Sequence, residues 1–512
     1  MLADRGDIAP MSQEIELKLS LPSRSLPALR RHPLVAGAPR EGKTCTLDNT
    51  YYDTPELALK ARKVAVRTRH QGRQWLQTVK CAAVSTGGLS QRPEWEQPYT
   101  DRFDFSAIDV PEVAKLLSRH KDELVPVFTT RFRRETRRYS PREGVCILLM
   151  IDTGSVEAVS RSAPICELEL ELVEGKPLDL LELACELART LPLMPGDVSK
   201  AQRGYQLFLD LPARPTKAEA IELSPDDTVI EAFRRHAFGC IRQWQANASA
   251  INEGHDGPEF IHQLRVSLRR LRSLIKLFAP ALPTEFVTEW NDRLRENANR
   301  FGDTRDLDVL HAELLAPVVA EGLADGAESG LPPLLKLIET ARQQARKDAL
   351  HNITHSAQGR LVLELNAALQ GLPVSNLIAA VDLKTFARLQ LDRLRKRARR
   401  RYEASVTLVP TQLHTLRIAM KQLRYGLEFF GSLLPARAVE RYLTGVTEAQ
   451  GTLGFLNDVD VARGRLNAWA GKRSDLLAAA SFIIGWHGPR YARLRRRVLQ
   501  EVEPLLWGKT PW

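Results

Sequence analysis

Charged and aliphatic residues alternate along several stretches of the first 210 or so residues. Glu14-Ile-Glu16-Leu-Lys18 is one such stretch. The others are residues 64–69, 75–80, 92–96 and 167–172. Successive side chains of a strand point to opposite faces, so each stretch predicts a strand with one charged and one apolar face. With helical patterns near 25–32, 111–120 and 178–190, the region is predicted to be α+β and dominated by antiparallel sheet.

The period of the hydrophobic pattern changes to 3.6 after a stretch rich in proline and polar residues at 211–218, which we interpret as a linker. Long helical patterns then continue to about residue 505 and are broken by prolines. One apolar stripe comprises Leu264, Leu268, Leu271, Ile275 and Phe278. We therefore predict an all-α domain at 219–505, following an α+β domain at 12–210.

The helical region contains a basic repeat. His262-Gln-Leu-Arg265-Val-Ser-Leu-Arg269-Arg-Leu-Arg272 returns 152 residues later, from 262 to 414, as His414-Thr-Leu-Arg417-Ile-Ala-Met-Lys421-Gln-Leu-Arg424. The same offset relates Gly302 to Gly454, Asp306 to Asp458 and Asp308 to Asp460. A duplicated helical unit explains this register. At 100° per residue, each copy places its cations in one arc beside the apolar stripe.

The net charge of the chain indicates which class of partner it binds. The chain of 512 residues is too long for one core and carries +11, almost all of it after residue 212. Such a field favours phosphate-rich partners. The repeat lacks interleaved aromatic residues for base stacking, so nucleic acid is the less favoured polyanion.

Cysteine usage and hydropathy suggest a compartment. The six cysteines include no CxxC pair, which argues against a disulfide framework or a zinc site and suits a reducing environment. No apolar run reaches the length of a transmembrane helix, so no membrane partner is expected. The N-terminus lacks the apolar core of a secretory signal. We expect a cytoplasmic protein.

The charged strand faces carry both signs. A single such strand is most simply explained by a solvated face, but five of them favour a shared cavity. Carboxylates hold a hard divalent cation, and Arg or Lys hold phosphoryl oxygens, Arg in bidentate fashion. Together they suit a metal–triphosphate complex.

Several motifs in residues 12–210 resemble the CYTH family, the triphosphate tunnel metalloenzymes. Glu14-Ile-Glu16-Leu-Lys18 resembles its ExExK signature, and Tyr51-Tyr-Asp-Thr-Pro55 its YYDTP turn. Further landmarks follow in order. They are Arg67-x-Arg69, Lys80, Arg92-x-Glu94-x-Glu96, Asp152, Glu167-Leu-Glu169 and Ser199-Lys200 with Tyr205. The resemblance implies an eight-stranded antiparallel barrel, open as a tunnel, with the charges inside.

The resemblance also implies roles. The phosphate contacts would be Lys18, Arg67, Arg69, Lys80, Arg92, Arg134 and Lys200. One or two Mg2+ or Mn2+ ions would be held by Glu14, Glu16, Glu94, Glu96, Asp152, Glu167 and Glu169. Catalysis would rest on Glu14, Glu16, Lys18, Glu167 and Glu169. Phe132 occupies a position where the family often has a basic residue, so Arg131 and Arg133 remain alternatives to Arg134.

The basic repeat, with Gly302-Asp-Thr-Arg305-Asp306-Leu-Asp308 after its first copy, resembles the CHAD domain. That resemblance implies two pseudo-symmetric four-helix bundles that bind inorganic polyphosphate, with the aspartates orienting arginines. The implied contacts are His262, Arg265, Arg269, Arg272, His414, Arg417, Lys421 and Arg424.

The expected function is metal-dependent hydrolysis of inorganic tripolyphosphate to pyrophosphate and phosphate, joined to polyphosphate binding. Two alternatives stay open at this point. One is action on an organic triphosphate, as thiamine triphosphatase or adenylate cyclase, for which Trp75 and Trp95 are the aromatic candidates. The other is a polyphosphate-binding protein without catalysis, against which the carboxylates speak.

Overall fold

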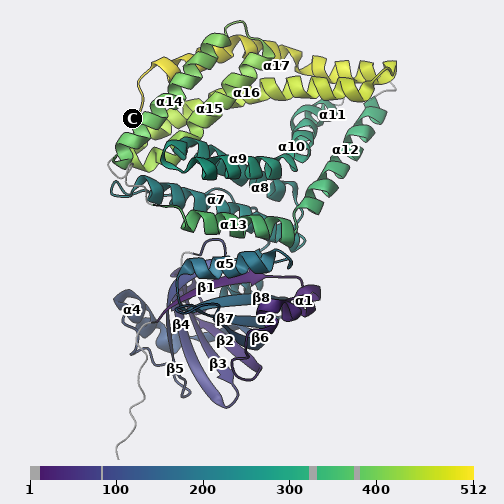
Figure 1. Ribbon diagram of the computed structural model, residues 1–512. Helices are drawn as coiled ribbons and strands as arrows, with labels where there is room; N and C mark the ends of the chain where they lie inside the picture. The colour runs from purple at the N-terminus through teal and green to yellow at the C-terminus, as the bar shows by residue number, and fades with distance from the viewer. Residues whose placement is uncertain (1–11, 82–84, 322–330, 374–380) are drawn as a thin grey trace, which may run out of the picture. The chain divides into compact units, whose positions relative to one another are not determined.

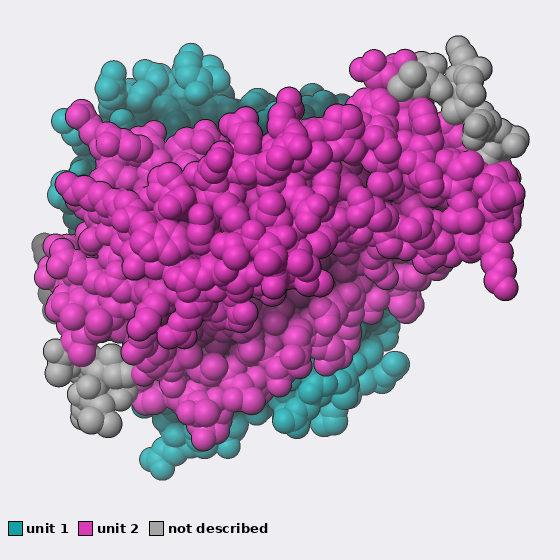
Figure 2. Space-filling model, turned by 90° about the horizontal axis from the view of Figure 1, so that it is seen from above, with its two compact units in different colours: residues 1–215, 245–255, 353–371 teal, residues 216–244, 256–352, 372–512 magenta. Residues whose placement is uncertain are grey.

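The computed structural model describes residues 12–81, 85–321, 331–373 and 381–512 (Figure 1). Two compact units divide the chain (Figure 2). Unit 1 comprises residues 1–215, 245–255 and 353–371, and unit 2 comprises 216–244, 256–352 and 372–512. Two segments from the stretch expected to be helical, 245–255 and 353–371, therefore belong to the unit that contains the strands.

Unit 1 is built on an antiparallel barrel, as the alternating pattern predicted (Figure 1). Pairing runs β5-β4-β3-β2-β6-β7-β8-β1-β9, and a further β1–β5 pairing brings the ends together. The first part of β1 pairs with β5 and the second part with β8, so β1 completes the ring. The bounds of the strands are as follows. They are β1 Ser12–Ser20, β2 Cys45–Asp53, β3 Val64–Gln71, β4 Gln74–Cys81, β5 Leu89–Pro98, β6 Val125–Tyr139, β7 Cys146–Ala158, β8 Arg161–Glu174 and β9 Met194–Pro195.

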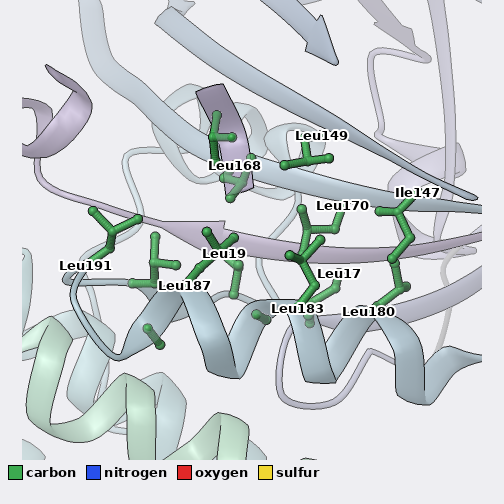
Figure 3. Packing of buried hydrophobic residues seen from close by; sticks show 14 of the residues in the cluster. Leu17, Leu19, Ile147, Leu149, Leu168, Leu170, Leu180, Leu183, Leu187 and Leu191 are labelled. Atoms are coloured by element: carbon green, nitrogen blue, oxygen red, sulfur yellow. The ribbon is translucent and has the colours of Figure 1, made fainter. Parts of the chain in front are cut away.

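The outward faces of β1, β7 and β8 form the main core of unit 1. Figure 3 shows Leu180, Leu183 and Leu187 of α5 (Pro177–Ala188) facing Leu17, Leu19 and the leucines of β8. These side chains are almost completely buried. Because the outward positions are apolar and packed under a helix, the alternate positions on the same strands must face inward.

Other helices of unit 1 cover the rest of the barrel. A second apolar cluster joins β3, β4 and β5 to α4 (Pro111–His120). Asp53 ends β2 and is fully buried. Its carboxylate accepts hydrogen bonds from the N–H groups of Leu59 and Lys60 in α3 (Ala58–Ala61) and from the hydroxyl of Tyr205. The remaining short helices are α1 (Leu26–Arg31), α2 (Pro33–Ala36), α6 (Lys200–Phe208) and α13 (Arg360–Gln370).

Unit 2 is helical, as the 3.6-residue period predicted. The duplication is visible in the bounds, because α8 (Pro258–Phe278) and α15 (Pro410–Phe430) each have 21 residues and begin at equivalent positions. The next helices, α9 (Thr284–Asn299) and α16 (Ala436–Ala470), also begin at equivalent positions. The other helices are α7 (Val229–Asn252), of which only residues 229–244 belong to unit 2, α10 (Gly302–Val309), α11 (Ala316–Ala320), α12 (Leu331–Asn352), α14 (Leu383–Ala404) and α17 (Ser474–Trp507). In the described residues, no helix has the length and apolar character needed to cross a membrane.

Candidate functional site

The inward faces of the barrel converge on one cavity of about 1150 Å³. The strands bring to its wall the acids and bases that are far apart in sequence. The predicted residues that line it are Glu14, Glu16, Lys18, Arg67, Arg69, Lys80, Glu94, Glu96, Arg134, Glu169 and Lys200. Asp152 and Glu167 lie just behind this wall and are fully buried. The side chain of Arg92 lies outside the described part, although its backbone pairs with Glu14.

Opposite charges face each other across neighbouring strands. The register pairs Lys18 with Glu169, Lys80 with Glu94, and Arg134 with Asp152. Cross-strand neighbours of opposite charge stabilise each other. The barrel can therefore hold many ionisable groups out of water, because each lies beside a partner.

Among the three candidate arginines of β6, Arg134 is the one that enters the cavity. It is bidentate to Asp152, at 2.8 and 2.6 Å, and reaches Glu169 at 2.5 Å. Arg131 and Arg133 are exposed, and Arg131 pairs with Asp48 on the outside. Phe132 also faces inward, where the amino group of Lys200 lies 4.7 Å from its ring centre.

An acidic cluster of Asp152, Glu167 and Glu169 lies at the centre of the site. One carboxylate oxygen from each lies within 4.8 Å of the others. Lys200 lies among them, with its amino group 2.7 Å from Asp152 and 2.9 Å from Glu169 and also in contact with Glu167. Lys200 is held there because α6 starts at this residue, with Ser199 as its cap and Gln202 completing a capping box.

The pKa values of two carboxylates on β8 are shifted in opposite directions. Burial alone would raise the pKa of Glu169, but the charges of Lys200, Arg134 and Lys18 outweigh it and hold that pKa well below its usual value. Burial and the neighbouring Glu14 raise the pKa of Glu171 to about 7. The ionised form is therefore favoured at Glu169, and the protonated form is favoured much more at Glu171 than at an ordinary glutamate.

The part of the wall formed by β3, β4 and β5 also carries both charges. The amino group of Lys80 bridges Glu14 at 3.0 Å and Glu94 at 2.7 Å. Arg67 and Arg69 approach Glu94 and Glu96 less closely, at 3.7 and 3.6 Å. Burial and the adjacent Arg67 lower the pKa of Arg69 to about 10. The Nε of Arg67 is buried without a hydrogen-bond acceptor, which is unusual for a native structure and marks a place for an oxygen-rich ligand.

The donor set of the acidic cluster fits a divalent metal ion. Three carboxylates supply hard oxygen ligands at close spacing, and such ligands are preferred by Mg2+ and Mn2+. Lys200 now neutralises this cluster, so an ion that binds there has to displace its amino group or share the carboxylates with it.

Comparison with known proteins supports both family resemblances, that of the barrel region and that of the helical region. Residues 12–205 match the family model of the CYTH domain, and residues 235–467 match that of the CHAD domain. The chain carries a CYTH domain and a CHAD domain. An inorganic triphosphatase of Haemophilus influenzae is 30% identical over 203 residues, which cover 38% of this chain. The chain spans only 55% of that relative's length.

Two solved structures are also similar to parts of the chain. The CHAD domain of Ricinus communis is 28% identical, with a TM-score of 0.49, and covers 58% of this chain and 99% of its own. A putative adenylyl cyclase from Hippeastrum, described as having a dominant triphosphatase activity, is 22% identical, with a TM-score of 0.28. It covers 40% of this chain and 98% of its own.

In the CHAD region, the cations of the two repeats meet. Burial first, and then the charges of Arg269, Arg417, Arg424 and Arg265, lower the pKa of Lys421 to about 6. Arg269 also donates to the hydroxyl of Tyr425, at 2.9 Å. We call Arg265, Arg269, Arg417 and Lys421 the cation cluster.

The aspartates and histidines of the repeats lie around the cation cluster. The charge of Asp306 acts on Arg265, and that of Asp458 acts on Arg417. Arg265 donates to the backbone oxygens of Phe301 and Gly302, at 3.1 and 2.7 Å. His414 contacts Asn457, whereas burial and Arg305, the equivalent of Asn457, lower the pKa of His262 to about 4. The two copies of the repeat therefore arrange equivalent residues in the same way, but they differ in charge because Arg305 of the first copy corresponds to the neutral Asn457 of the second.

The remaining predicted contacts of the CHAD domain are less central. Burial, and then the charge of Arg295, lower the pKa of Arg272, which has Asp292 as its other charged neighbour. Arg424 pairs with Glu428 at 3.2 Å. Both side chains are partly exposed.

Sequence reasoning missed two residues of the CYTH site. Glu171 lines the cavity, and continuing the alternation of β8 by one step beyond Glu169 would have found it. Arg203 reaches the buried Glu167 at 3.0 Å from α6. Its position one turn after Lys200 was the available signal, since residues three apart share a helix face.

Proposed function

We propose that the CYTH domain hydrolyses inorganic tripolyphosphate to pyrophosphate and phosphate with the help of a divalent cation. The observation that supports this most directly is a cavity whose wall carries several Lys and Arg side chains together with Glu169, the member of the acidic cluster that lines it. Phosphate binding alone has no need of three buried carboxylates. The similarity to an inorganic triphosphatase points the same way.

The residues divide by charge. Lys18, Arg67, Arg69 and Lys80 would hold phosphoryl oxygens, and the unsatisfied Nε–H of Arg67 is available to donate a hydrogen bond to one of them. Arg134 and Lys200 contact the acidic cluster, so they would lie beside the phosphoryl group nearest the ion. Their positive charges would stabilise the negative charge that develops during transfer.

Asp152, Glu167 and Glu169 would hold the cation, with Glu14 and Glu16 of β1 and Glu94 and Glu96 of β5 as further candidates. When bound, such an ion neutralises phosphoryl oxygens and lowers the pKa of a bound water. In the overall reaction, a water oxygen forms a bond to the terminal phosphorus, the bond to the pyrophosphate oxygen breaks, and one proton is released.

A substrate panel tests this proposal. We expect the full-length protein to release phosphate from tripolyphosphate faster than from ATP or thiamine triphosphate, with Mg2+ or Mn2+ required. In the described part of the chain, Trp75 is half exposed and is not among the residues of the cavity wall, which leaves Trp95 as the one tryptophan there. A preference for either organic substrate would replace the inorganic assignment, and no hydrolysis of any of the three would refute it.

We further propose that the CHAD domain binds inorganic polyphosphate at the cation cluster. The supporting observation is that cations of both repeats lie around the partly buried amine of Lys421, whose pKa is lowered by burial first and then by these charges. Unlike the CYTH site, this cluster has no group of three close carboxylates among the described residues. A polyanion would relieve the repulsion without any metal.

Charge reversal tests this binding. We expect Arg269→Glu with Lys421→Glu, in the full-length protein, to weaken polyphosphate binding by more than about 100-fold, because two charged hydrogen bonds are worth roughly 3 kcal/mol or more together. Calorimetric titration measures this. Arg437→Glu with Lys472→Glu changes net charge equally at exposed positions and should change the affinity little. Equal losses in both double variants would mean that net charge, and not the cluster, binds the polyanion.

Proton uptake gives an independent test. The folded pKa of Lys421 lies far below its usual 10.5, so at pH 7.5 its amine is mostly neutral before binding. A polyanion raises this pKa, so binding takes up a proton and weakens as pH rises above about 6, by up to about tenfold per unit. Titrations in two buffers of different ionisation enthalpy measure the uptake. Lys421→Arg should abolish it while still binding polyphosphate, and unchanged uptake in that variant would contradict the assignment.

A further inference from the structure

Both the N–H and the C=O of Lys18 are hydrogen-bonded to glycines that line the cavity. Its N–H donates to the oxygen of Gly88 at 2.9 Å, and its C=O accepts from the N–H of Gly196 at 3.0 Å. Its amino group lies 3.9 Å from Glu16 and 3.7 Å from Glu169. The position of Lys18 in the cavity therefore depends on where these two glycine segments lie.

The first segment is the turn before β5. Asp197 accepts from the N–H of Gly88 at 2.9 Å and from the hydroxyl of Ser85 at 2.6 Å. Gly87 and Gly88 have positive φ angles of 63° and 82°, a conformation that other residues rarely adopt. The turn is thus closely defined by its backbone and by one carboxylate.

The same turn is contacted by a residue far along the chain. Asn366 of α13 is fully buried, and its amide donates to the oxygen of Thr86 at 3.3 Å. A Cβ on Gly87 would lie only 2.5 Å from that amide, so the turn and α13 are closely packed at this point. Leu363 of the same helix is part of the leucine core beneath α5 and β1.

The second glycine segment is contacted by the same part of the chain. Gly359, just before α13, packs so closely on the backbone oxygen of Leu193 that a Cβ there would overlap it. Leu193 precedes β9, whose two residues pair with Leu19 and Ser20 of β1, and Gly196 follows β9 directly. Residues 353–371 therefore contact both segments that hold Lys18.

We propose that residues 353–371, although they lie within the CHAD match, brace the phosphate-binding wall of the CYTH domain, with Asn366 as a positioning residue for Lys18. This inference rests on the proposed function, because it assigns Lys18 to the triphosphate. Asn366 touches neither the cavity nor the acidic cluster; it acts through Thr86, Gly88 and the backbone of Lys18.

The test measures binding of tripolyphosphate without metal, by calorimetry, together with KM and kcat in its presence. We expect Asn366→Leu, which lacks the amide donor, to raise Kd and KM about three- to tenfold while kcat changes less than twofold, because losing an interaction that is equally strong in the bound substrate and in the transition state raises KM without lowering kcat. Arg360→Ala on the same helix should behave as the wild type, since Arg360 is exposed and pairs with Glu364 within the helix.

A double-mutant cycle separates positioning from general destabilisation. If Asn366 acts through Lys18, adding Asn366→Leu to Lys18→Met should leave Kd unchanged relative to Lys18→Met alone. A normal Kd in Asn366→Leu, or a further loss in the Lys18→Met background, would overturn the inference. If Asn366→Leu does not fold, Asn366→Ala, which also lacks the amide donor, takes its place in the same cycle. A wild type that neither binds nor hydrolyses tripolyphosphate would instead refute the proposed function, and the inference with it.

Discussion

Replacing Glu169 with glutamine is expected to reduce tripolyphosphate hydrolysis by more than about 100-fold, since even residues that only support a metal ligand cost 10- to 100-fold when changed. Glu169 contacts Arg134, Lys200 and Lys18 and belongs to the acidic cluster. Glutamine keeps the shape and removes the charge, so the loss reports electrostatics and not packing. Initial rates of phosphate release over a range of Mg2+ concentrations measure it.

The control is Glu174→Gln on the same strand, where the side chain is exposed. It should hydrolyse tripolyphosphate at the wild-type rate. Full activity of Glu169→Gln at every Mg2+ concentration would remove Glu169 from the site. Activity that recovers only at high Mg2+ would indicate that this carboxylate mainly sets metal affinity.

The faces of the strands could be predicted from the sequence because the side-chain period of a strand is two. Once Leu17 and Leu19 were assigned to the core, Glu16 and Lys18 had to face the interior, and the structure places them there. The same reasoning applies to β8. The choice of Arg134 over Arg131 and Arg133 needed the register of β6 with β7, which depends on pairings between residues distant in sequence.

Other features lie beyond local patterns. The apolar positions of residues 360–370 predict a helix, but nothing in them says that this helix packs on α5 and reaches the turn at Thr86. The acidic pattern of β8 likewise predicts a metal site without predicting that Lys200 lies inside it. Both features depend on how elements that are distant in sequence pack together, and the spacing of apolar or charged residues within one element carries no information about that packing.

Lys200→Met should destabilise the metal-free protein by about 3–5 kcal/mol, because removing one partner of a buried ionic group leaves uncompensated charge. Lys200 is 6% exposed, and Asp152 and Glu167 are fully buried around it. Arg134 and Arg203 neutralise only part of this cluster. In EDTA, we expect the melting temperature of the unit 1 transition to fall by roughly 10 °C.

Added Mg2+ should reverse much of this loss, and this reversal distinguishes a metal site from a purely structural ion-pair network. In the wild type an ion competes with the amino group of Lys200 for the carboxylates, so Mg2+ should raise its melting temperature less than that of Lys200→Met. Ligand binding stabilises a folded protein by about 2.7 kcal/mol at 100 times its Kd, which is enough to recover most of the shift. Lys115→Met, an exposed change on α4, should show neither the loss nor the reversal. If Lys200→Met melts at the lower temperature with and without Mg2+, the cluster is an ion-pair network that takes no metal, and Lys200, Arg134 and Arg203 supply the positive charge that the carboxylates require.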